Sequence, residues 1–117
     1  MYVTGIGGPS FYPQSPLSRL AEAKTIAINL EDHLIAFIEN LGREGEMFAL
    51  QDKINMQVSS LTNLYQNQKT FFNPEQQKAM DIVIKQLALF KGTDAGLITP
   101  EQLTPALESV KDLIQTF

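Results

Sequence analysis

The stretch that decides the fold is residues 16–42, which read PLSRLAEAKTIAINLEDHLIAFIENLG. Ser15 is a suitable N-cap, Pro16 suits the first helical position, and Gly42 suits the end of a helix. A seven-residue apolar period of this kind is typical of a helix that packs along other helices. Two such series run through the stretch: Leu20, Ala27, Leu34 and Leu41, and Ala23, Leu30 and Phe37.

The next segment predicts a second helix, over residues 44–72. Its apolar positions again follow a seven-residue spacing, and only a short linker separates it from the first helix. A short linker favours an antiparallel hairpin, in which a 25-residue helix would be roughly 38 Å long. Additional isoleucines widen the apolar stripe of the first helix, so it must contact more than one neighbour: Ile26, Ile28, Ile35 and Ile38.

Two further helix starts are marked by nearly identical capping sequences. Residues 73–76 read NPEQ and residues 99–102 read TPEQ, each with a cap, a proline, an acid and a glutamine. Ile98 and Leu103 have the spacing of a hydrophobic staple. Because a proline inside a helix costs about 3 kcal/mol, Pro105 suggests a short turn over residues 100–103 and a last helix capped by Thr104.

These segments predict an all-α protein resembling a four-helix bundle. We expect one helical domain over residues 16–117, made of a long hairpin (16–72) and a shorter helix pair (73–117). Residues 1–15 carry no charge and contain three Gly and two Pro, which favours a mobile arm. Phe11 and Tyr12 make this arm unusually apolar, so it either packs loosely on the domain or orders on a partner.

Composition and charge exclude several classes of protein. Thirteen acidic and nine basic residues give a net charge of −4, which excludes a generally basic nucleic-acid binder. The absence of cysteine excludes disulfide scaffolds, iron–sulfur clusters and thiolate zinc sites. The longest apolar run is residues 34–38, too short to span a membrane. The first 18 residues lack the features of a standard signal peptide.

Residues 91–102, KGTDAGLITPEQ, resemble an EF-hand loop, with Gly96 as the turn glycine and Ile98 two residues later. In that register Lys91, Ala95 and Gln102 occupy positions where a calcium loop needs oxygen ligands, above all a terminal glutamate. We therefore expect an ordinary connection between helices that binds no metal. A regulatory module built on a degenerate EF-hand remains an alternative.

Catalytic patterns are almost absent from the sequence. His33 is the only histidine and follows two acids, a setting typical of a solvated surface residue. No serine or cysteine pattern points to a nucleophile, and a helical hairpin offers little concave surface for a small substrate. We expect no enzyme activity, no cofactor and no small-molecule substrate, and a small enzyme of unknown type is the remaining alternative.

Interaction with another protein is the function that these observations favour. Residues 54–68 (INMQVSSLTNLYQNQ) carry no charge, unlike most exposed surfaces. Either a partner helix covers this strip, or the two later helices do. Since the hairpin should be longer than the helices beside it, we expect apolar surface to remain uncovered. The expected partner contacts are Ile28, Ile35, Val58 and Tyr65, together with Phe11 and Tyr12 in the arm.

The layout of residues 1–72 resembles small helical components of bacterial type III secretion systems. The likeness lies in the GIGGPSFYPQSP arm, the absence of Cys and Trp, and the Gln/Asn/Ser-rich helix DKINMQVSSLTNLYQNQ. Needle, inner-rod and filament subunits and their chaperones or regulators belong to this group. The resemblance implies a location in the bacterial cytoplasm or export without a standard signal peptide. Residues 74–117 depart from the minimal needle or rod pattern.

Addition of calcium tests the expectation that residues 91–102 bind no metal. Because three ligand positions of residues 91–102 are filled by Lys91, Ala95 and Gln102, millimolar calcium should leave the melting temperature unchanged. Thermal unfolding followed by circular dichroism, with magnesium as the control, measures this. A rise in melting temperature with calcium but not with magnesium would contradict the prediction.

Overall fold

A computed structural model of the chain describes residues 16–117, and the side chains from Ser18 onward. The described residues are all-α and form α1 (Pro16–Glu39), α2 (Glu44–Asn67), α3 (Pro74–Leu87), α4 (Leu89–Gly92) and α5 (Pro100–Gln115). Two short 3-10 helices, η1 (Lys69–Phe71) and η2 (Ala95–Leu97), lie in the connections. The arm predicted over residues 1–15, with Phe11 and Tyr12, lies outside the described residues.

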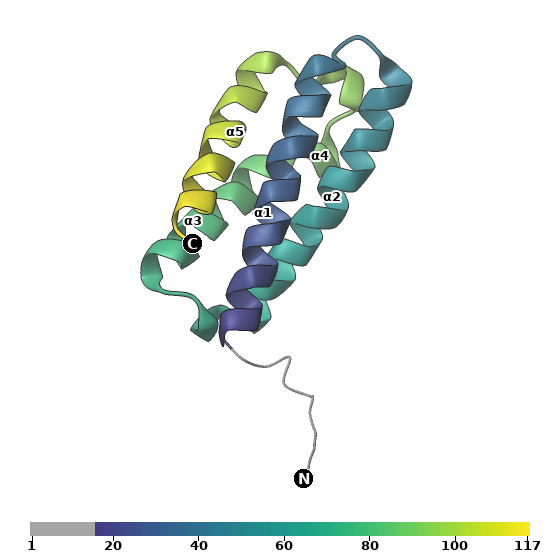
Figure 1. Cartoon of the computed structure of the whole chain (residues 1–117). Coiled ribbons are helices and arrows are strands. Elements are labelled where there is room, and N and C mark those ends of the chain that lie inside the picture. The colour runs from purple at the N-terminus through teal and green to yellow at the C-terminus, as the bar shows by residue number, and fades with distance from the viewer. Residues whose placement is uncertain (1–15) are drawn as a thin grey trace.

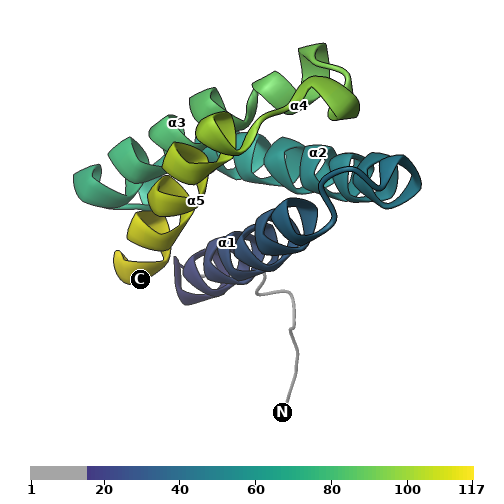
Figure 2. The same cartoon turned by 90° about the horizontal axis from the view of Figure 1, so that it is seen from above.

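The helices surround one core in the spatial order α1, α2, α3, α5. α1 packs against both α2 and α5, and α3 packs against both α5 and α2 (Figure 1). Seen from above, α1 and α2 form one side of the molecule, and α3, α4 and α5 lie together on the other (Figure 2). The expected antiparallel hairpin and shorter pair are therefore present, in an arrangement resembling a four-helix bundle.

The buried face of α1 is formed by residues of the seven-residue apolar pattern in the sequence. Five of its side chains have no exposed surface: Ala23, Ala27, Leu30, Leu34 and Phe37. Phe37 also meets Phe90 of α4 edge to face, with ring centroids 5.2 Å apart. The turn after α1 needs Gly42, whose φ of 92° lies in the left-handed region that favours glycine.

α2 is shorter than the sequence suggested, because it ends at Asn67 rather than at residue 72. The chain continues into η1 and then into extended backbone at Phe72, whose side chain is buried. Asn73 must also be extended to cap the next helix ahead of Pro74, so the helix cannot continue to that point.

The predicted capping box at the start of α3 is confirmed, and its glutamine also makes a long-range hydrogen bond. The Gln76 backbone N–H donates to Asn73 Oδ1 at 2.8 Å, and the Asn73 N–H donates to Gln76 Oε1 at 3.0 Å. Gln76 Nε2 also donates to the Thr116 carbonyl at 3.0 Å, which joins the start of α3 to the end of α5. Gln76 is the one buried polar residue of the described chain.

The start of the last helix differs from the expectation. α5 runs unbroken from Pro100 to Gln115 with Pro105 inside it, so the predicted restart at Thr104 is wrong. The capping box of Thr99 and the buried Ile98 and Leu103 already hold the start of the helix. Glu101, whose carbonyl loses its partner at Pro105, is exposed, so water can satisfy that group.

The expectation that apolar surface stays uncovered along the hairpin is confirmed only in part: Ile28, Ile35, Phe48 and Met56 are exposed, but no continuous apolar strip is left open. α3 and α5 alone are short, but α4 and η2 extend the cover toward the start of α2. Their buried residues Phe90 and Ala95 complete the core at that end. The sequence did not reveal this because residues 91–102 predict only an ordinary connection between helices.

Glutamines at the same position of two capping boxes allow a matched stability test. Gln76→Ala should lower the free energy of unfolding by about 2–3 kcal/mol, because it leaves the Thr116 carbonyl and the Asn73 N–H without partners. Gln102→Ala, at the exposed start of α5, should cost about 1 kcal/mol or less. Urea denaturation measures both, and equal losses would contradict the additional role of Gln76.

Candidate protein-binding surfaces

Two of the predicted partner contacts are exposed on α1. Ile28 and Ile35 retain 39% and 37% of their accessible surface. They are two turns apart and lie on one flank of the helix. His33, which contacts α2, lies roughly 150° around the helix from them, so this flank faces away from α2. We call Ile28 and Ile35 the α1 flank.

The two predicted contacts on α2 do not lie on an open surface. Val58 is only 2% exposed and belongs to the core, so its prediction as a partner contact is wrong. Tyr65 is half-buried against the core, and the Lys69 ammonium lies 4.8 Å from its ring centroid. The apolar stripe of α2 is wide because α1, α3 and α4 all cover it, and not because part of it is free.

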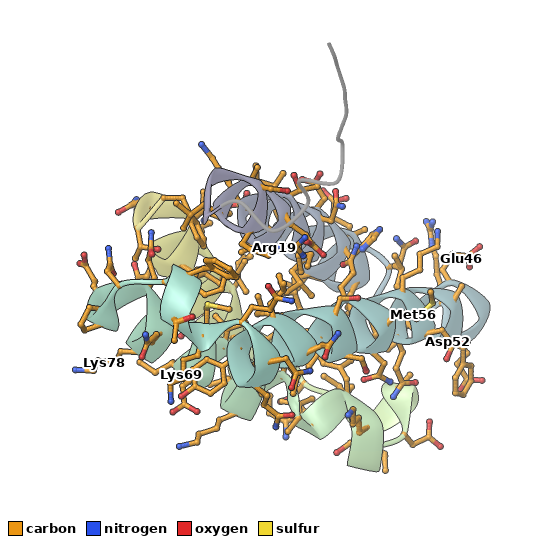
Figure 3. All side chains as sticks on the ribbon, turned by 90° about the horizontal axis from the view of Figure 1, so that it is seen from below. Arg19, Glu46, Asp52, Met56, Lys69 and Lys78 are labelled. Atoms are coloured by element: carbon orange, nitrogen blue, oxygen red, sulfur yellow. The ribbon has the colours of Figure 1, made fainter. Side chains whose placement is uncertain are left out.

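The uncharged stretch of residues 54–68 is divided between two environments. Its inner side carries Ile54, Val58 and Leu61 in the core. Its outer side is exposed and uncharged, so α3 and α5 do not cover the whole strip. Met56 stands on this side with 70% of its surface accessible (Figure 3). We call this surface the α2 outer face: Met56, Ser59, Ser60, Asn63 and Asn67.

Three other exposed apolar side chains were not singled out in the sequence. Leu97 in η2 is 71% exposed, Phe48 near the start of α2 is 48% exposed, and Ile82 of α3 is 38% exposed. Periodicity could have indicated Met56, because it falls between the core positions Ile54 and Val58. Leu97 had no such signal, since it lies outside any periodic segment.

His33 is not the solvated residue that the sequence suggested. It is partly buried, and its Nδ1 lies 2.9 Å from Gln57 Oε1. This hydrogen bond joins α1 to α2, which gives His33 a structural role. Within residues 16–117 no three His, Cys, Asp or Glu side chains come close enough to hold a metal ion.

The segment resembling an EF-hand loop has a different geometry. Gly96 lies in η2, and Gly42 is the described glycine with positive φ, so the sharp glycine turn is missing. Gln51 Nε2 donates to the carbonyls of Phe90 and Thr93 at 2.7 and 2.8 Å, and Asn55 Nδ2 also donates to Phe90 at 3.0 Å. These hydrogen bonds hold the start of the segment against α2.

A groove of about 470 Å³ lies between the start of α3 and the end of α5. Its lining includes Glu75, Lys78 and Asp112, so charges of both signs surround it. Binding sites for small molecules are mostly apolar and enclosed, with a few convergent polar groups, and this groove has neither property.

Charged side chains outside these surfaces form a solvated exterior. Lys85 and Asp81 pair at 3.0 Å along α3, and this hydrogen bond raises the pKa of the Lys85 ammonium.

No helix in the described part of the chain is both long and apolar enough to cross a membrane. Comparison with known protein families, with curated proteins and with solved structures finds no match to this chain.

A glutamate placed on either side of α2 tests the assignment of its two faces. Val58→Glu should cost several kcal/mol and unfold the protein, because the new carboxylate is buried without a partner. Met56→Glu should change the free energy of unfolding by less than about 0.5 kcal/mol. Urea denaturation followed by circular dichroism compares them. Similar losses of stability in the two variants would mean that the outer face is not exposed to solvent.

Proposed function

We propose that this chain is a non-enzymatic helical module that binds another protein through the α1 flank. The observation that carries the proposal is the exposure of two isoleucines, Ile28 and Ile35, on a rigid helix. Their spacing of seven residues, roughly 10.5 Å along the axis, matches the contacts that a docking helix makes in a helical groove. Assembly subunit, adaptor and chaperone are the roles that fit such a surface.

The chemistry of the described residues supports this choice over catalysis. The only histidine is engaged with Gln57, and the groove between α3 and α5 has a mixed-charge lining. An enzyme would need convergent titratable groups in a sheltered pocket. A binding module needs only an exposed apolar surface on a stable scaffold, and α1 provides one.

Within this class, the resemblance to type III secretion components supports a role in bacterial protein export. The resemblance covers residues 1–72, which include the hairpin of α1 and α2. Because α3 and α5 cover one side of this hairpin, we favour a chaperone, adaptor or regulator over a needle subunit. Export can be tested by fusing residues 1–15 to a reporter. The fusion is expressed in a strain with an active secretion system and in its secretion-deficient mutant.

Site-specific photo-crosslinking tests partner binding at the α1 flank. A photoreactive amino acid at position 28 or 35, introduced in the producing cells, should yield one discrete adduct. The same residue at Asn29, which is exposed roughly 100° around α1 from Ile28, should not yield it.

The protein identified in the adduct is then purified and titrated with the wild-type chain. The double variant Ile28→Glu/Ile35→Glu should keep its fold, because both side chains are exposed, and should weaken binding by at least tenfold. No adduct at either position, or binding unaffected by the double variant, would contradict the proposal.

A further inference from the structure

We propose that an apolar patch with an acidic rim, formed where η2 packs on the start of α2, binds a basic amphipathic segment of another protein. Its apolar centre is Phe48 and Leu97, and its rim carries the carboxylates of Glu44, Asp52 and Asp94. We call these five residues the α2–η2 patch. None of them belongs to the α1 flank, so the inference goes beyond the function proposed above.

On α2, one line of exposed side chains presents an aromatic ring between two carboxylates. Glu44, Phe48 and Asp52 are four residues apart, so each lies roughly 40° around the helix and 6 Å along it from the next. All three are exposed, and Phe48 retains 48% of its surface. The ring therefore has a negative charge one helical turn away on either side.

η2 presents a second apolar side chain next to another carboxylate. Leu97 is 71% exposed. The Asp94 carboxylate turns back onto this short helix, where its Oδ1 accepts a hydrogen bond from the Gly96 N–H at 3.2 Å. Negative charge is thus held close to Leu97 by the local fold of the connection.

The two halves of the patch meet at Gly96. η2 packs against α2. A Cβ atom at Gly96 would lie 3.8 Å from Asp94 Oδ1 and 3.9 Å from Glu44 Oε2, so carboxylates from two separate elements face the same point. This point adjoins Leu97 in the chain and lies by the turn of α2 that precedes Phe48.

No ion pair within residues 16–117 neutralises any of the three rim carboxylates. Arg43 precedes the first of them, but its Nη1 donates to Asn40 Oδ1 at 3.4 Å, toward α1. Lys53 lies on another side of α2, roughly 140° around the helix from the exposed ring. Lys91 of α4 is exposed and pairs with none of the three. The patch therefore keeps an excess of negative charge beside its apolar side chains.

Charge complementarity selects the occupant of this patch. The carboxylates of Glu44 and Asp94 repel each other, and an ammonium or guanidinium group from another molecule would relieve that repulsion. Apolar side chains beside that cation would cover Phe48 and Leu97, and burial of apolar surface favours association. Acidic segments lack the first contact, and purely polar basic segments lack the second. Five side chains are few against the roughly 20–30 residues per side of a standard interface, so we expect weak, reversible binding.

A synthetic peptide serves as the probe for this chemistry. A fluorescein-labelled amphipathic peptide of leucine and lysine is titrated with the purified full chain, and binding is followed by fluorescence anisotropy. One control peptide has glutamate in place of every lysine, and the other has serine in place of every leucine. The leucine–lysine peptide should bind about tenfold more tightly than either control.

Matched removal of charge locates the peptide on the protein. Glu44→Gln/Asp94→Asn removes two carboxylates from the patch, and Glu75→Gln/Asp112→Asn removes two exposed ones from the groove between α3 and α5. Both variants change the net charge equally. The first should weaken binding of the leucine–lysine peptide by about fivefold or more, and the second by less than about twofold.

Removal of the apolar centre tests the other half of the proposal. Phe48→Ser/Leu97→Ser should also weaken binding of the leucine–lysine peptide by about fivefold or more. Far-UV circular dichroism confirms that each variant is folded. Equal weakening by the two charge removals, unchanged binding by the double serine variant, or equal binding of the three peptides would overturn the proposal. Because no variant alters Ile28 or Ile35, such a result leaves binding at the α1 flank a separate question.

Discussion

The wide apolar face of α1 is the constraint on which the rest of the structure depends. Five of its side chains are completely buried, and Ile26 and Ile38 are packed beside them. One neighbouring helix cannot cover a face of this width. α2 covers one part and α5 the other, so the chain must cross from α2 to α3 and then return through α5. The order of the helices around the core follows from this requirement.

Each reversal of the chain leaves backbone carbonyls without helical partners, and side-chain amides satisfy several of them. Gln51 and Asn55 hold α4 and the turn after it, and Gln76 holds the end of α5. Gln77 donates to the carbonyls of Lys69 and Phe72 in the connection between α2 and α3. The ten Gln and six Asn of the chain therefore include residues that join turns to helices.

The same helix, α2, serves three purposes on three sides. One side supplies the core, a second carries the amides that hold α4, and the third is the exposed outer face. This division explains why its sequence is polar yet uncharged over residues 54–68. Burial excludes charge on the first side, and hydrogen bonding to turns requires amides on the second. On the outer face, Ser60 donates to the Met56 carbonyl and Asn67 to the Asn63 side chain, so uncharged polar groups there bond within α2 itself.

The sequence by itself determined the helical class, the start of α1 at Pro16 and the capping boxes of α3 and α5, because these depend on neighbours within a few residues. It also indicated Ile28 and Ile35 as surface candidates. Only the tertiary structure decided that Val58 is buried, that Gln76 reaches Thr116, and that helix α5 continues through Pro105. The physical reason is that each of these outcomes depends on segments up to 40 residues apart, or on whether water reaches a group, and local periodicity contains neither.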